Sequence, residues 1–77
     1  SDYIKIHLKN ETIVTRETIS SIEAKLPKKF FIRIHRSFIV SVSNITSYTN
    51  DTVIVNDKEL TISRSYKKEV LQILETY

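Results

Sequence analysis

Apolar and polar residues alternate over much of the chain, in the period-2 pattern that indicates half-buried β-strands. Near the start, Ile4, Ile6 and Leu8 alternate with polar neighbours, and residues 12–16 have the composition of a returning strand. Asn10 lies between them and suits a tight turn. Further strands are predicted over residues 30–34, 38–42, 45–49, 52–55 and 59–62, the last two as a hairpin.

One segment in the first half of the chain changes to helical spacing. Ile19, Ile22 and Leu26 recur at intervals that place them on one helix face. Thr18 is a suitable N-cap, and Pro27 cannot continue a helix. The pattern therefore predicts a short helix that ends by Leu26.

The C-terminal segment shows a longer helical pattern, with Ser63 or Ser65 as its cap. Its apolar positions form one stripe, made of Tyr66, Val70, Ile73, Leu74 and Tyr77. Together these elements predict a single, mainly β domain, antiparallel in its pairing, with one short internal helix and a C-terminal helix.

Composition argues against catalysis. The chain has 77 residues with no cysteine and no glycine, so it holds no thiolate metal site, P-loop or dinucleotide-binding glycine motif. Its two histidines, His7 and His35, lack the spaced partners of a metal site. A domain this small also struggles to enclose a substrate pocket. We expect a binding module, with no catalytic residues, no metal and no cofactor.

Charge is unevenly distributed, although the net charge is only +3. Residues 24–50 contain no Asp or Glu, and a second basic cluster lies near the C-terminus. The cations of these two regions are Lys25, Lys28, Lys29, Arg33, Arg36, Arg64, Lys67 and Lys68. Such segregation favours a polyanionic partner. An ordinary solvated surface with uneven charge explains it about as well.

One residue in the segment FFIRIHRSFIVS does not fit its strand. Arg36 falls in the apolar column that holds Ile32 and Ile34, and an unpaired arginine in a core costs several kcal/mol or more. A bulge or turn at residues 35–37 would direct it outward. The alternative is a buried Arg36 paired with a carboxylate such as Glu23 or Glu59.

The segment TISRSYKKEVLQIL is a second candidate for contact with an anionic partner. A strand ends at Ile62 and a helix begins within three residues, with Arg64 in the connection. The N–H groups and dipole of a helix start suit a phosphate. Lys67 and Lys68 are unfavourable beside that dipole unless an anion is the usual neighbour. Ordinary solvated lysines are the alternative.

Four pieces of sequence in order resemble the LytTR family of bacterial DNA-binding domains. They are the strand DYIKIHL, the helix TISSIEAKLP, the strand FFIRIHRSFIV and the end LTISRSYKKEVLQIL, and together they span essentially the whole chain. The resemblance implies an elongated, LytTR-like antiparallel β-sheet or sandwich that lies along duplex DNA and inserts loops into successive major grooves. The family's first strand or strands are expected upstream of residue 1, so residues 1–77 would form a LytTR domain without them.

The resemblance also implies which residues contact DNA. Those expected at bases are Arg36, Arg64 and Asp2. Those expected at the DNA backbone are Arg33, His35, Ser37, Lys67, Lys68 and Thr18. Independently of the family, an arginine bidentate to guanine is the commonest specific major-groove contact, whereas lysines and serines on phosphates set register and affinity.

The expected context is the cytoplasm of a bacterium, as the output domain of a response regulator with an upstream receiver domain and a sensor kinase. The domain would bind double-stranded DNA at repeated half-sites as a homodimer, without membrane contact. One alternative is a small β protein-interaction module whose basic face docks an acidic protein. Single-stranded nucleic acid is less favoured, because stacking needs exposed aromatics and only Tyr3 and Tyr48 were expected to supply them.

Overall fold

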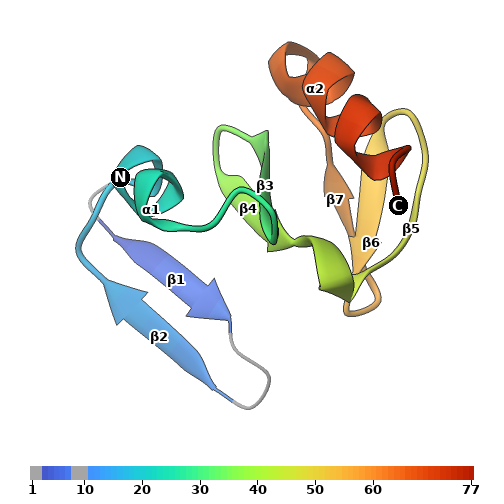
Figure 1. Cartoon of the computed structure of the whole chain (residues 1–77). Coiled ribbons are helices and arrows are strands. Elements are labelled where there is room, and N and C mark those ends of the chain that lie inside the picture. The colour runs from blue at the N-terminus through green and yellow to red at the C-terminus, as the bar shows by residue number, and fades with distance from the viewer. Residues whose placement is uncertain (1–2, 8–10) are drawn as a thin grey trace.

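A computed structural model describes residues 3–7 and 11–77. In chain order the elements are β1 (Ile4–His7), β2 (Thr12–Thr15), α1 (Ile19–Lys25), β3 (Phe31–His35), β4 (Phe38–Ser41), the 3-10 helix η1 (Val42–Asn44), β5 (Ile45–Tyr48), β6 (Thr52–Val55), β7 (Lys58–Thr61) and α2 (Arg64–Leu74). The described strands form three antiparallel sheets, β1–β2, β3–β4 and β5–β6–β7 (Figure 1). The predicted fold class, mainly β with two α-helices, is confirmed.

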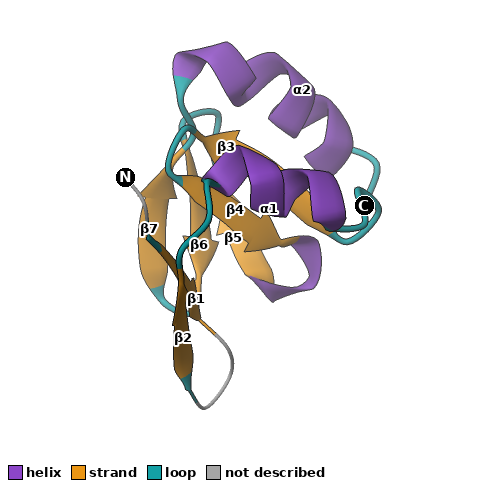
Figure 2. Cartoon of the chain, turned by 90° about the vertical axis from the view of Figure 1, so that its left-hand side faces the viewer, coloured by secondary structure: helices purple, strands orange, loops and turns teal. Residues whose placement is uncertain are grey.

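The hydrophobic core lies between α2 and the strands that follow α1. Its buried residues are Ile32, Ile34, Val40, Val53, Ile62, Val70 and Leu74. Three of these side chains, Ile34, Val53 and Val70, are at most 1% exposed, and burying each is worth roughly 1.5–3 kcal/mol. No described residue of β1, β2 or α1 is fully buried. The N-terminal hairpin and α1 therefore lie outside the core (Figure 2).

The short helix α1 forms as its sequence predicts. The side chain of Thr18 accepts a hydrogen bond from the backbone N–H of Ser21 at 3.0 Å, which satisfies one of the free donors at the helix start. Leu26 is extended, with φ −90° and ψ 142°, because the residue before a proline avoids the helical region. Both ends of α1 are thus determined by local sequence.

Turns without glycine use asparagine, aspartate and threonine. Asn56 and Asp57, between β6 and β7, have positive φ values of 52° and 65°, which is the conformation of a two-residue type I′ hairpin turn. Between β5 and β6, the hydroxyl of Thr49 accepts hydrogen bonds from the backbone N–H groups of Asp51 and Thr52 at 3.1 and 3.0 Å. The predicted hairpin of the last two strands is confirmed.

Some local predictions need correction. Helix α2 ends at Leu74, so Tyr77 is not part of its apolar stripe and is instead 73% exposed. Ser63 occupies the N-cap position of α2, but its side chain makes no capping hydrogen bond. The 3-10 helix η1 was not predicted. The turn expected at Asn10 lies outside the described residues.

Candidate nucleic-acid interface

The turn between β3 and β4 contains a change of register. Arg33 pairs with Ile39 while His35 pairs with Phe38, so β3 carries one extra residue and the ladder shifts there. Residues 36–37 then form a two-residue turn, which we call the recognition turn, and both of its residues are exposed. The predicted change of direction at this place is confirmed. The alternative of a buried Arg36 paired with Glu23 or Glu59 is wrong.

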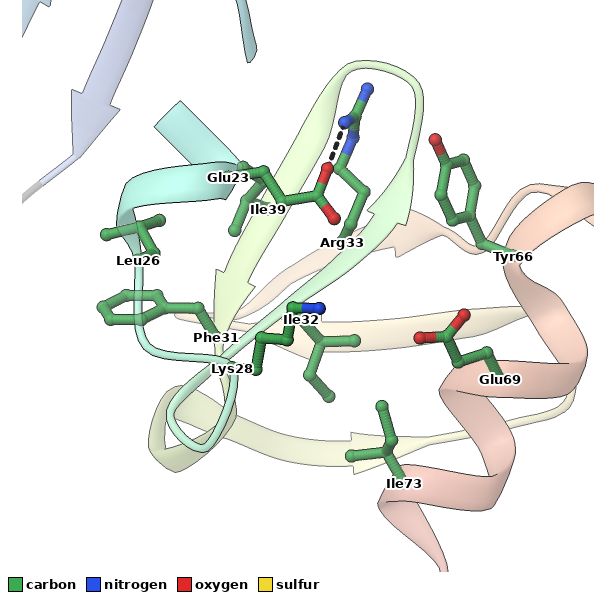
Figure 3. A pocket seen from close by; sticks show the side chains of 10 residues that line it. All are labelled: Glu23, Leu26, Lys28, Phe31, Ile32, Arg33, Ile39, Tyr66, Glu69 and Ile73. Atoms are coloured by element: carbon green, nitrogen blue, oxygen red, sulfur yellow. Dashed lines mark hydrogen bonds and ion pairs between the residues drawn. The ribbon is translucent and has the colours of Figure 1, made fainter. Parts of the chain in front are cut away.

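The paired arginine is Arg33, which is partly buried and whose side chain is only 8% exposed. Its Nη1 donates to Glu23 Oε1 at 2.6 Å, its Nε to the His35 carbonyl at 2.7 Å, and its Nη2 to the Arg36 carbonyl at 2.8 Å. Its guanidinium also lies 5.5 Å from the centre of the Tyr66 ring on α2. Figure 3 shows the Arg33–Glu23 pair beside Tyr66. With its donors engaged in this way, Arg33 is poorly placed to contact a phosphate.

His35 and Ser37, two of the expected DNA-backbone contacts, hold each other inside the turn. The backbone N–H of Ser37 donates a hydrogen bond to His35 Nδ1 at 3.1 Å. The imidazole also lies against Phe38, with ring centroids 4.8 Å apart. Ser37 is exposed in the same turn.

The connection from β7 into α2 lies beside this turn. The backbone N–H of Ser63 donates to the carbonyl of Ile34 at 2.9 Å, next to the register shift. Arg64, the first residue of α2, is exposed, as is Lys68. Both views place the recognition turn and the start of α2 at the same end of the molecule (Figures 1 and 2). The structure thus brings together two of the segments expected to contact bases.

Of three further expected DNA contacts, one is paired within the protein, one is exposed and one lies outside the described residues. Lys67 forms an ion pair with Asp51, whose carboxylate side chain is 73% exposed. Thr18 is exposed at the start of α1, where its hydroxyl oxygen serves as the cap. Asp2 lies outside the described residues.

Exposed aromatic residues are more numerous than expected. Phe30 and Tyr77, which were expected to be structural, are 56% and 73% exposed, compared with 65% for Tyr3 and 41% for Tyr48. The Tyr77 hydroxyl donates to the Lys29 carbonyl at 3.0 Å. No local sequence pattern indicates this contact, because it joins Tyr77 to the segment before β3.

A small cavity of about 150 Å³ opens between α1, β3 and α2 (Figure 3). It is lined by Glu23, Leu26, Lys28, Phe31, Ile32, Arg33, Ile39, Tyr66, Glu69 and Ile73. Its volume is below the roughly 300 Å³ typical of small-molecule sites. Among the described residues there is no group of three or more potential metal ligands, and no helix long and apolar enough to cross a membrane.

Comparison with known families identifies the kind of domain that carries these residues. The LytTr DNA-binding domain family matches residues 1–75. The chain belongs to the LytTR family. A solved LytTr DNA-binding domain from Bacillus cereus superposes with a TM-score of 0.79 at 29% identity, covering 91% of this chain and 70% of that one. The exposed Arg36 and Arg64 are therefore features of a DNA-binding domain.

Curated relatives of this LytTR domain are named as regulators. Sensory transduction protein LytT of Bacillus cereus is 32% identical over 92% of this chain and 31% of its own length. LytT of Enterococcus faecalis is 41% identical over 68% of this chain and 24% of its length. Transcriptional regulatory protein LytR of Staphylococcus aureus is 31% identical over 83% and 28%. The chain thus spans about a third or less of the length of these relatives.

Proposed function

We propose that this LytTR domain recognises duplex DNA sequence-specifically, with Arg36 and Arg64 on base edges in the major groove. One observation carries the proposal: the recognition turn and the start of α2 lie at one end of the molecule and are joined by the Ser63–Ile34 hydrogen bond. Both arginines are exposed on backbone that is fixed by hydrogen bonds.

Arginine suits this role for a geometric reason. Its planar guanidinium can donate two hydrogen bonds to O6 and N7 of guanine, and each such pair contributes about 1–3 kcal/mol of discrimination against the wrong base. A lysine or serine on a phosphate fixes register without conveying sequence information. We therefore assign discrimination to Arg36 and Arg64, and retain Asp2 as a third expected base contact.

The proposed DNA-backbone contacts lie around these arginines. Ser37 and Lys68 are exposed beside Arg36 and Arg64, and Thr18 is exposed at the start of α1. Lys67 can contribute once a phosphate replaces Asp51 as its partner. His35 contributes mainly by fixing the turn, through Ser37. Arg33 is left out of this set because its donors hold the protein itself.

The relatives support a wider proposal about context. They are named as sensory transduction and transcriptional regulatory proteins, and are about three times as long as the matched segment. We propose that this domain is the output part of a cytoplasmic bacterial response regulator. A receiver domain would precede it, a sensor kinase would act on that domain, and two copies would bind repeated half-sites.

Selection from a random duplex pool at about 150 mM salt tests the proposal, because non-specific phosphate binding is weak under those conditions. The wild-type chain, Arg36→Ala and Arg64→Ala are compared, with Lys58→Ala as a control that removes one exposed cation from the start of β7. We expect an enriched motif for wild type and Lys58→Ala, with a different position relaxed in each arginine variant.

Three other results would contradict the proposal. Salt-dependent retention without enrichment would mean that the basic surface binds phosphates only. No retention, together with binding to an acidic protein surface, would favour the interaction module. Better retention of single strands than of duplexes would point to the exposed aromatic residues instead.

A further inference from the structure

We infer that Arg33 is a positioning residue for DNA recognition, which holds the recognition turn, α1 and α2 in one fixed arrangement. This inference rests on the proposed function, since it assigns how Arg36 and Arg64 are kept in place. It gives Arg33, in β3, a role different from the one proposed for Arg36 in the recognition turn.

The first step concerns the turn itself. Arg33 donates from Nε and Nη2 to the carbonyls of His35 and Arg36, at 2.7 and 2.8 Å. These two carbonyls lie at the point where the chain leaves β3 and enters the turn. A side chain that binds both restricts the backbone of Arg36, so the Arg36 side chain starts from a defined position.

The second step concerns the neighbouring helices. On one side, Glu23 of α1 accepts from Arg33 Nη1 at 2.6 Å. On the other, the guanidinium lies 5.5 Å from the Tyr66 ring, two residues after Arg64 in α2. One guanidinium thus contacts three elements that carry proposed DNA contacts (Figure 3).

The third step excludes the alternative role. The Arg33 side chain is 8% exposed, whereas that of Glu23 is 42% exposed. Moving this guanidinium onto a phosphate would break hydrogen bonds to both carbonyls and leave their oxygens without these donors. Holding groups in their bound arrangement before binding reduces the entropy lost on association. Arg33 therefore favours recognition through its contacts within the protein, and does not itself contact DNA.

Glu23 provides a test in which two explanations predict opposite signs. Removing an acid from a DNA-binding surface normally strengthens binding to every duplex, because it removes repulsion from phosphates. If Glu23 instead holds Arg33 in place, Glu23→Ala should weaken binding to the preferred sequence. Glu69 offers a matched control, because it lines the same cavity from α2 and has no ion pair with Arg33 in the described part of the chain.

The experiment measures affinity and its salt dependence on two duplexes, the one enriched by the wild-type chain and a shuffled version of it. We expect Glu23→Ala and Arg33→Lys to lose about tenfold in affinity for the enriched duplex, while affinity for the shuffled duplex is unchanged or, for Glu23→Ala, higher. Glu69→Ala should not lose affinity for either. Glu23→Gln, which keeps an oxygen acceptor, should recover part of the loss.

Circular dichroism melting separates these effects from unfolding, and Tyr66→Leu replaces Arg33→Lys if that variant does not fold. The inference is overturned if Glu23→Ala behaves like Glu69→Ala on both duplexes. It is also overturned if Arg33→Gln, which removes the positive charge, reduces the salt slope on both duplexes by about one unit, the sign of a direct phosphate contact. Failure of the wild-type chain to enrich any duplex would instead reject the proposed function, and the inference with it.

Discussion

The backbone N–H of Ser63 donates a hydrogen bond to the carbonyl oxygen of Ile34 at 2.9 Å. Ile34 lies where the β3–β4 ladder changes register, between the pairs formed by Arg33 and His35. A register shift disrupts ladder hydrogen bonds locally, and the β7–α2 connection supplies a donor at that place. The irregularity that turns Arg36 outward is thereby tied to the backbone that precedes Arg64.

Lys68→Ala should weaken binding to all duplexes alike. Lys68 is exposed and is proposed to contact a phosphate, so its loss should reduce the salt slope by about one unit without changing the enriched motif. Titrations at several salt concentrations provide the measurement. A relaxed base preference in this variant would contradict the assignment.

Asp51→Asn should strengthen non-specific binding. Asp51 pairs with Lys67 at the start of α2, and removing its charge leaves the lysine available to a phosphate and removes a repulsion. Affinity for a shuffled duplex at low salt is the measurement. Asp57→Asn, a change of the same charge in the β6–β7 turn, is the control and should have a smaller effect.

Val53→Ala should lower the free energy of unfolding by about 2 kcal/mol, because it leaves a cavity at a side chain that is 0% exposed. Val14→Ala makes the same chemical change at a residue that is 58% exposed, and should cost less than about 1 kcal/mol. Urea denaturation of the two variants gives the comparison. Equal losses would mean that the core is not where we place it.

Asp57→Gly should stabilise the domain by about 1 kcal/mol. Asp57 has a φ of 65°, a conformation that costs a non-glycine residue energy, and glycine is the residue most favoured at the second position of a type I′ turn. Thermal melting would detect the gain, whereas Asp57→Ala should give none.

Amide hydrogen exchange should be faster in the β1–β2 hairpin than in β3 and β6. No described residue of β1 or β2 is fully buried, whereas Ile34 and Val53 have 0% exposure. Segments with little burial open locally at a lower free energy cost. Exchange followed by mass spectrometry gives the comparison, and similar protection in both regions would refute it.

Much of the fold was predictable because it depends on neighbouring residues. Thr18 caps α1 by accepting a hydrogen bond from Ser21, only three positions along the chain. Asn56 and Asp57 form their turn from their own positive φ values, without contacts from distant segments. The identity of the buried arginine was not predictable in this way. Alternation assigned Arg36 to the apolar column and Arg33 to the polar one, whereas in the structure Arg36 is exposed and the Arg33 side chain is only 8% exposed.

The reason lies in contacts between distant segments. Arg33 is held by Glu23 from α1 and by Tyr66 from α2, which no local pattern connects. The sequence indicates Glu23 as one possible partner for a buried arginine, but it indicates Arg36 as that arginine. The ion pair between Asp51 and Lys67 joins residues sixteen positions apart and equally lacked a sequence signal. Whether Arg36 and Arg64 contact bases stays a prediction.

The separation of the core from the recognition turn has a consequence for diversification. The buried residues of the core do not include Arg36 or Arg64, both of which are exposed. Surface substitutions away from special contacts usually change stability by less than about 0.5 kcal/mol. Under the proposed assignment, one scaffold can therefore acquire new promoter preferences through positions 36 and 64, and a library randomised at those two codons should remain largely folded.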